Sequence, residues 1–434
     1  MVRMGRMTVV WVACGAPPAE PAPPPAREAR FSAALEAGAA LARGFSPPPL
    51  LEASEGYQMY YTSGTSGFPK GVVLSYANVS AHAHAAITEF GFGPSDAWGH
   101  FAPMYHLVDA YAIYALTWVG GSHALLPTWE TQAALRVMAT CRLSATHVAA
   151  TMLQMLLTNP LRPTLDLSAL RMISCGGSAL PTALVAQAFE AFGAAFFTSY
   201  GMTECCGKIS VSRLGPSELG LPHAEQLRLV GSQGKPFTGM EVRVTAADSG
   251  ADAAAGEVGE VRIRGPTVLS EYWRRPEASA EALVGGWFRT GDLGVLDSRG
   301  WLTLVDRAKD MILFAGENVY SAEVERVVAS HAAVHLAAVY GVPDPSGQFG
   351  ELVKAVVQLK DGAALTRREL QAHCASHLAR YKVPAVVEFV ALIPLTGSGK
   401  VHKSVLKERE TQLKPAAPAA VVAVVPSPRP PEAP

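Results

Sequence analysis

A loop rich in serine, threonine and glycine constrains the fold of this 434-residue chain more than any other segment does. The run before it, Tyr57 to Tyr61, is aromatic and typical of a strand, and a helical pattern begins near Ser75. Glycines let backbone N–H groups approach an anion, hydroxyls add donors, and Lys70 adds a mobile positive charge. The sequence therefore predicts an anion-binding loop after a strand, formed by Thr62-Ser63-Gly64-Thr65-Ser66-Gly67-Phe68-Pro69-Lys70-Gly71.

The order of residues in this loop excludes a Walker-type phosphate loop. A Walker motif needs Gly-Lys followed by Ser or Thr and running directly into a helix. Here Pro69 precedes Lys70 and Gly71 follows it. A Ser/Thr/Gly turn with an incidental lysine is the alternative interpretation.

Composition favours a globular protein of two or three domains, because 49% of the residues are hydrophobic. A formal net charge of −1 excludes general electrostatic attraction to nucleic acid or anionic lipid. The six cysteines show no Cys-x-x-Cys spacing, which favours free thiols in a reducing compartment over a zinc site. The uncharged run from 110 to 129 is interrupted by Gly120-Gly121 and Pro127. We interpret it as a buried helix and a short strand rather than a membrane span.

Four regions follow from the pattern along the chain. Residues 1–50 are Pro-rich and are expected to form an irregular leader, which could be a transit or secretory segment or a mispredicted start. Residues 51–308 alternate strand and helix patterns and predict a large α/β domain, with a hairpin at 293–297 and 301–305. Residues 309–412 predict a small α+β domain, and 413–434 an extended Pro/Ala-rich tail.

Seven further segments contain residues suited to a nucleotide site. A carboxylate such as Glu204 can hold Mg²⁺ on a triphosphate, Asp292 can accept two hydrogen bonds, and the glycines around Lys400 let an ammonium cross a cleft. Taken singly, each segment could be a structural histidine, a plain turn or a solvated charged surface. The segments are Ala102–His106, Cys175–Ser178, Ser199–Glu204, Trp287–Asp292, Asp306–Asp310, Gly316–Glu325 and Pro394–Lys400.

The loop and these segments, in this order, resemble the adenylate-forming (AMP-binding) superfamily. That superfamily contains acyl-CoA synthetases, aryl-CoA ligases, adenylation domains and luciferase, and the resemblance to acyl-CoA and long-chain fatty acid-CoA ligases covers about Tyr57 to Leu406. It implies an α/β fold, with stacked α/β subdomains and a β-rich part in the large domain and a mobile small domain. The family has a longer region before the loop, so the N-terminal region here is shortened by comparison.

The resemblance also implies a role for each matched residue. The residues expected to bind the ATP phosphates are Thr62, Ser63, Gly64, Thr65, Ser66, Gly67 and Lys70. Those expected to bind adenine and ribose are Gly176, Gly177, Ser178, Tyr200, Gly201, Asp292 and Arg307. The expected catalytic residues are Lys400, Thr203 and Glu204, with Glu204 also on the metal; Lys309 is the hinge. His106 and Met202 are expected in the acyl pocket, and Gly316 and Glu317 at coenzyme A.

The implied activity joins a carboxylic acid to coenzyme A through an acyl-AMP, with ATP, Mg²⁺ and coenzyme A as cofactors or co-substrates. The expected pocket residues include no evident charged partner for a second carboxylate, which favours an apolar tail, aliphatic or aromatic, over a dicarboxylate, and a fatty acid is the leading substrate. An aryl acid, coumarate-like or succinylbenzoate-like, is the alternative, and a non-catalytic nucleotide- or acyl-binding relative is another. No nucleic acid and no transmembrane segment are expected. The expected location is the cytoplasm, or an organelle if the leader is a transit segment.

Overall fold

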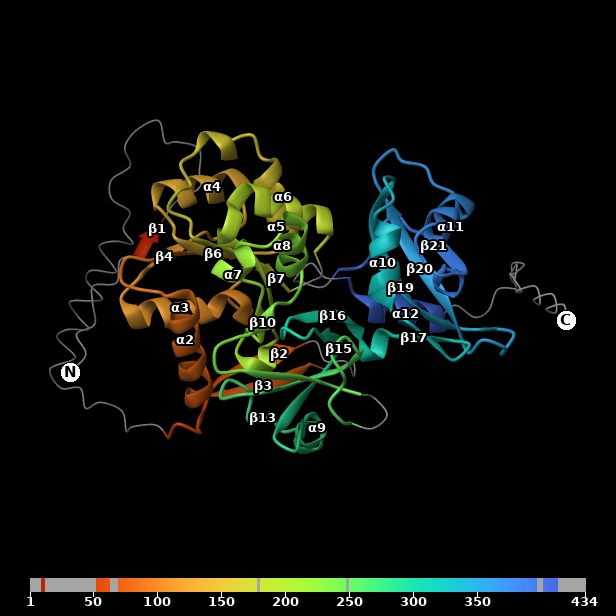
Figure 1. Ribbon diagram of the computed structural model, residues 1–434, viewed down its shortest axis with the longest axis horizontal. Helices are drawn as coiled ribbons and strands as arrows, with labels where there is room; N and C mark the ends of the chain where they lie inside the picture. The colour runs from red at the N-terminus through yellow and green to blue at the C-terminus, as the bar shows by residue number, and fades with distance from the viewer. Residues whose placement is uncertain are drawn as a thin grey trace. The chain divides into compact units, whose positions relative to one another are not determined.

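The computed structural model describes residues 9–11, 52–62, 69–177, 180–246, 250–395 and 401–412 (Figure 1). The chain divides into two compact units, Met1–Ala308 and Lys309–Pro434. We refer to them as unit 1 and unit 2. The α/β fold with a large N-terminal part and a smaller C-terminal part confirms the expected fold class.

A mainly parallel sheet forms the centre of unit 1. Among the described residues it has eight strands, and every residue of its central strand Ala145–Val148 is buried. Such short apolar strands are typical of a parallel sheet that is covered on both faces. The strands, in spatial order, are β1 (Val9–Trp11), β5 (Ser122–Leu125), β4 (Ala97–His100), β6 (Ala145–Val148), β7 (Met172–Gly176), β8 (Phe196–Tyr200), and the antiparallel β9 (Ser210–Val211) and β10 (Lys235–Pro236).

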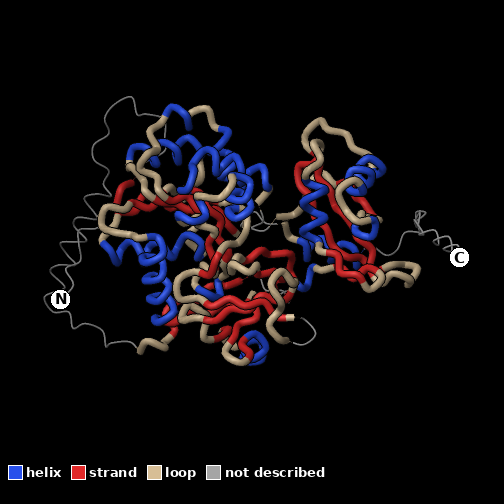
Figure 2. Tube along the Cα trace, in the orientation of Figure 1, coloured by secondary structure: helices blue, strands red, loops and turns tan. Residues whose placement is uncertain are grey.

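Helices cover both faces of this sheet, as Figure 2 shows. One apolar core lies under α4 (Thr131–Thr140), α5 (Ala150–Thr158), α6 (Thr182–Phe192) and α8 (His223–Val230). A second core includes buried residues of α2 (Tyr76–Phe90) and α3 (Leu107–Val119). The short helices are α7 (Pro216–Leu219) and α9 (Pro276–Ala282).

The apolar run at 110–129 forms the end of α3 and strand β5, as the interrupting glycines predict. Helix α3 ends at Gly120, which has a left-handed conformation with φ of 76°. No helix in the described part of the chain is long and apolar enough to cross a bilayer.

Strand β1 differs from the expectation of an irregular leader. Val9–Trp11 pair in parallel with β5 and extend the sheet by one strand. The β-branched pair Val9-Val10 and Trp11 suit a strand, but three residues between polar and Pro-rich segments are too few for a pattern that sequence reasoning can identify. The rest of residues 1–50 lies outside the described residues.

The β-rich part of unit 1 contains two smaller sheets. The first is β2 (Gly56–Thr62), β3 (Lys70–Ser75) and β13 (Glu271–Tyr272); the second is β11 (Glu241–Thr245), β12 (Gly259–Arg264), β15 (Trp287–Leu296), β14 (Leu283–Val284) and β16 (Leu302–Arg307). Strand β2 confirms the strand expected at 57–61, and antiparallel β15 and β16 confirm the expected hairpin. The Ser/Thr/Gly loop therefore lies between two antiparallel strands, and α2 begins only after β3, where Ser75 forms a capping box with Asn78.

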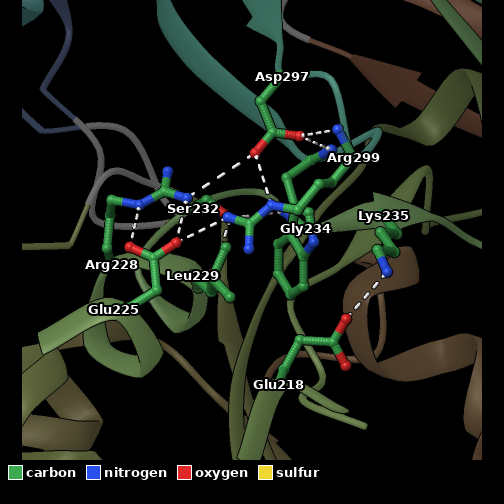
Figure 3. Close-up of polar contacts among 10 residues, drawn as sticks. Glu218, Glu225, Arg228, Leu229, Ser232, Gly234, Lys235, Asp297 and Arg299 are labelled. Carbon is green, nitrogen blue, oxygen red and sulfur yellow. Dashed lines mark hydrogen bonds and ion pairs between the residues drawn. The ribbon is translucent and has the colours of Figure 1, made fainter. Parts of the chain in front are cut away.

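An ion-pair cluster connects helix α8 with the turn between β15 and β16 (Figure 3). Glu225 contacts Arg228 and Arg299 at 2.8 and 2.7 Å, and Asp297 lies 3.7–3.8 Å from both guanidinium groups. The two arginines hold the pKa of Glu225 at about 2. Because all four side chains are solvent-exposed or partly so, the cluster fixes geometry more than it adds stability.

Unit 2 has an α+β arrangement. Strands β19 (Val334–Pro343) and β20 (Glu351–Leu359) are antiparallel, β21 (Val386–Phe389) pairs in parallel with β20, and β17 (Ile312–Phe314) pairs with β18 (Glu317–Val319). The helices are α10 (Ser321–Ala329), α11 (Arg367–Ala375) and α12 (Lys403–Gln412). The elements follow one another as strands, helix, two strands, helix, strand and final helix, which is the α+β composition that the sequence predicts for this region.

Three of the four histidines that are buried in the described part of unit 1 belong to α2, β5 and β6. His82 of α2 and His147 of β6 are each 1% exposed, and His123 of β5 is 7% exposed. Burial lowers the pKa of His82 to about 3 and that of His123 to about 4, and it places the pKa of His147 well below its usual value. Folding therefore keeps these rings neutral at a pH where the unfolded chain protonates them.

We expect the protein to lose stability as the pH falls below about 6.5. Between about pH 6.5 and pH 4 the unfolded state binds protons that the folded state rejects, so the free energy of unfolding decreases with falling pH. For His82 alone the difference amounts to about 3 kcal/mol at pH 4.

The unfolding midpoint, followed between pH 7.5 and 4, measures the slope of stability against pH. His82→Gln should flatten it, whereas His335→Gln, at an exposed position, should not. Equal slopes in both variants would contradict the assignment to buried rings.

Candidate nucleotide site

The loop between β8 and β9 carries several of the predicted site residues at its tip. Tyr200, the last residue of β8, pairs with Ser210, the first residue of the antiparallel β9, and Thr203–Cys205 form a turn of 3₁₀-helix. Backbone N–H groups of 205 and 207 donate to the Met202 carbonyl at 3.3 and 3.1 Å. Cys206 has φ of 60°, an uncommon value for a residue other than glycine. The loop is thus tightly folded, and it places Thr203 and Glu204 at its end.

Gly201 is required where this loop begins. A Cβ atom at this position would lie 1.5 Å from the Gly207 carbonyl oxygen, and that oxygen belongs to the backbone and cannot rotate away. The close approach of two backbone segments therefore excludes a side chain at Gly201.

Gly201→Ala should destabilise the protein by about 3 kcal/mol, because overpacking against backbone forces the whole loop to shift. The matched control is Gly220→Ala. Gly220 has φ of −80° and no atom closer than 3.6 Å to a built Cβ, so that alanine should be neutral or slightly stabilising. Denaturant unfolding of both variants measures the difference, and equal stabilities would show that the loop can relax.

Glu204 lies beside Tyr272 of the three-stranded sheet and beside Leu269, which precedes strand β13. The Tyr272 hydroxyl donates to Glu204 Oε1 at 3.0 Å, and the Leu269 N–H donates to the Glu204 carbonyl at 2.7 Å. Lys70 Nζ lies 4.9 Å from the centroid of the Tyr272 ring. The structure therefore brings Lys70, at the end of the Ser/Thr/Gly loop, into the neighbourhood of Glu204.

Asp292 forms the second half of the site. It is 5% exposed and accepts a hydrogen bond from the Tyr200 hydroxyl at 2.6 Å, and Arg307 Nε lies 3.2 Å from its other carboxylate oxygen. Thr290 Oγ1 accepts from the Asp292 N–H at 3.1 Å. Tyr200, 92 positions before Asp292, and Arg307, 15 positions after it, thus hold this carboxylate in a fixed orientation.

The two halves share an electrostatic environment. Burial raises the pKa of Glu204, while Tyr272, Arg307 and Lys70 act in the opposite direction. Lys70 and Arg307 can donate hydrogen bonds to phosphate oxygens, and the Glu204 carboxylate can then coordinate a metal ion. No described residues form a group of three or more side chains able to hold a metal by themselves. The residues therefore fit a Mg²⁺ ion that takes its remaining ligands from phosphate and water.

Several predicted residues have a simpler local explanation or are not described. A Cβ at Gly176 would lie 2.3 Å from the Ser199 carbonyl oxygen, so packing on β8 alone requires that glycine. His106 is the N-cap residue of α3 without a side-chain capping hydrogen bond, and both it and Met202 are half-buried. Ser63, Gly64, Thr65, Ser66, Gly67, Ser178 and Lys400 lie outside the described residues. Lys309, Gly316 and Glu317 belong to unit 2, where Glu317 is exposed in β18.

Two residues near the site were missed by sequence reasoning. Tyr272 follows an acidic residue in a two-residue strand, and no pattern distinguishes it from other exposed or buried tyrosines. Lys208 comes four residues after Glu204, and its charge suggests a surface position, yet it is only 1% exposed. Its proximity to the Tyr-Gly-Met-Thr-Glu segment was the available signal.

Comparison with known proteins identifies the family. The chain matches the AMP-binding enzyme family over residues 8–273 and the AMP-binding enzyme C-terminal domain over 323–400. It is 37% identical over 352 residues to a feruloyl-CoA synthase of Amycolatopsis sp, covering 81% of this chain and 69% of the relative. It is 36% identical to a long-chain-fatty-acid–CoA ligase of Yersinia pestis, covering 82% and 62%.

A solved structure agrees with these matches. The o-succinylbenzoate coenzyme A synthetase of Bacillus subtilis, in complex with ATP and magnesium ion, is 30% identical, with a TM-score of 0.74 over 84% of this chain and 72% of that one. The site geometry, the matches along both units and this likeness lead to the same conclusion: the chain belongs to the family of AMP-binding enzymes.

Proposed function

We propose that the protein is an ATP-dependent carboxylic acid–CoA ligase. The observation that carries the proposal is the convergence of Lys70, Glu204, Arg307 and Asp292 around one site in unit 1. Two cations, a metal-binding carboxylate and a buried hydrogen-bond acceptor suit a triphosphate, its magnesium ion and a ribose. The relatives, which are CoA ligases and synthases, support the same activity.

In the first step a carboxylate oxygen of the acid attacks the α-phosphorus of ATP. The bond from that phosphorus to the bridging oxygen breaks, and pyrophosphate leaves. Lys70 and the hydroxyl-rich loop hold the β- and γ-phosphates, Asp292 accepts hydrogen bonds from the ribose, and Thr203 meets the α-phosphate. Glu204 would hold Mg²⁺, which would neutralise phosphate charge.

In the second step the thiol of coenzyme A attacks the acyl carbonyl, and AMP leaves.

The small unit contributes residues to both steps. Lys400, from the segment after Pro394, stabilises the charge that develops in the first step. Unit 2 then turns at Lys309 and brings Gly316 and Glu317 to the thioester reaction. These three assignments rest on the resemblance of the segments to the family.

Acid-dependent exchange of labelled pyrophosphate into ATP tests the proposal. The full chain should catalyse exchange with at least one acid from a panel of fatty and aryl acids, and should give no exchange without acid. A folded protein that binds ATP and shows no exchange with any acid would be a nucleotide-binding relative without catalytic activity. The panel is needed because the relatives act on ferulate, succinylbenzoate and long-chain fatty acids, which differ in chemistry.

A further inference from the structure

A cavity in unit 1 lies outside the candidate nucleotide site. Its volume is about 400 Å³, within the range of about 300–1,000 Å³ that is usual for small-molecule pockets. The segment that follows α5, where Arg162–Thr164 form a turn of 3₁₀-helix, and the last residues of α6 both contribute to its wall. The lining includes Arg162, Leu165, Leu167, Leu170, Ala191 and Phe192.

This cavity and the nucleotide site lie at opposite edges of the central sheet. Leu170, which lines the cavity, comes two residues before β7, whereas Gly176 ends β7 in the segment expected at adenine. Five residues of strand span about 17 Å. Phe192 likewise precedes the start of β8, and Tyr200 ends that strand next to Asp292. A molecule in the cavity is therefore separate from the groups of the nucleotide site.

Arg162 is the charged member of the lining, and its side chain is half-buried. Its Nε is buried and has no hydrogen-bond partner, and its guanidinium group forms no ion pair, within the part of the chain that the structure describes. Asp166, an acidic residue of the same segment, lies 3.5 Å from Arg142 instead. A buried donor without an acceptor is costly. An anion bound in the cavity would supply the missing acceptor.

The end of α6 offers a structural reason for an arginine at this place. The last turn of a helix carries a partial negative charge, which favours a nearby cation. Nε of Arg162 nevertheless donates to none of the α6 carbonyl groups, so this part of the fork stays available to a ligand. The same partial charge disfavours a dianion. A singly charged carboxylate therefore fits the cavity better than a phosphate monoester does.

We propose that this cavity is a second, non-catalytic binding site for a small apolar monocarboxylate. The planar fork of Arg162 matches the two oxygens of a carboxylate, and both hydrogen bonds are strengthened by charge. The hydrocarbon part of the ligand packs on Leu165, Leu167, Leu170 and Phe192, which removes apolar surface from water. The inference goes beyond the proposed ligase function and does not depend on it, because no group of the nucleotide site takes part.

Calorimetric titration of the full chain with octanoate tests this site. Arg162→Gln should weaken octanoate binding at the site by about 10-fold or more, because charge-assisted hydrogen bonds are lost. Ala191→Phe keeps the arginine but places a bulky group in the cavity wall, and it should remove the same binding component. The matched control is Arg136→Gln, which changes an exposed arginine of α4 and should bind octanoate as the wild type does.

Two further ligands test the chemistry of the polar end. Octan-1-ol has the same tail without the charge and should bind about 10-fold more weakly than octanoate. Octyl phosphate, a dianion near neutral pH, should bind no more tightly than octanoate. Tighter binding of the alcohol or of the phosphate would overturn the assignment to a carboxylate.

ATP affinity and the unfolding midpoint separate loss of this site from a general defect. Both should be unchanged in Arg162→Gln, because that side chain has no partner in the described residues and lies at the far edge of the sheet. Unchanged octanoate binding in both Arg162→Gln and Ala191→Phe would place the ligand elsewhere and overturn the inference. Loss of ATP binding in a folded Arg162→Gln protein would overturn the separation of the two sites. None of these outcomes depends on pyrophosphate exchange, which tests the ligase proposal by itself.

Discussion

Adenylation should be abolished, and ATP binding largely retained, when Lys400 is replaced by alanine. Negative charge accumulates on the α-phosphate as the carboxylate attacks, and an ammonium that follows this charge acts in the transition state more than in the bound ground state. Removing such a group costs at least 10²–10³ in rate when it is one donor among several. The residues that we propose bind the nucleotide, Lys70, Arg307 and Asp292, remain in this variant, so the affinity for ATP should change little.

Pyrophosphate exchange and equilibrium ATP binding, measured on the same preparation, check this result. Lys360→Ala is the matched control, because Lys360 is an exposed lysine of unit 2. An adenylation rate in Lys400→Ala equal to that of the control would refute the role of Lys400. Loss of ATP binding together with the rate would assign Lys400 to nucleotide binding instead.

Glu204→Gln should lower adenylation by about 10²–10³-fold without lowering stability. Glutamine keeps the shape of the side chain and can still accept from the Tyr272 hydroxyl, but it loses the charge that we propose holds Mg²⁺. Since burial raises the pKa of Glu204, a neutral amide at this position removes a desolvation cost rather than a stabilising charge.

The dependence of exchange on the Mg²⁺ concentration distinguishes this mechanism from a general defect. The variant should require more Mg²⁺ for half-maximal rate, whereas Glu190→Gln, at an exposed position of α6, should behave as wild type. A rate loss that is independent of Mg²⁺ would argue against Glu204 as the metal-binding carboxylate.

The sequence predicted most of the elements that position this site. The strand before the Ser/Thr/Gly loop, the glycine-terminated helix α3 and the β15–β16 hairpin all follow from local residue patterns. Such features depend on turn residues and periodicity, which are local properties. The grouping of Lys70, Glu204, Arg307 and Asp292 followed from resemblance, since no local pattern brings residues so far apart in the chain together.

What the sequence could not predict depends on tertiary packing. Tyr272 reaches Glu204 only because a two-residue strand pairs with β3, and pairs this short have no periodicity. Lys208 is buried because α2 and α3 cover it, although lysine is rarely buried. Strand β3 was not predicted, because Lys70 and Gly71 were assigned to the anion-binding loop and a helical pattern begins near Ser75.

The hydrogen bond from Tyr200 to Asp292 has a consequence beyond orienting one carboxylate. Tyr200 ends a strand of the central sheet and Asp292 lies in the five-stranded sheet, so one contact joins two separately built layers. The Asp292 side chain, which we propose accepts from the ribose, therefore loses its conformational entropy when the two sheets associate during folding, before any nucleotide binds. A substitution at Tyr200 or Asp292 that changes nucleotide affinity should therefore also change how strongly the two sheets associate.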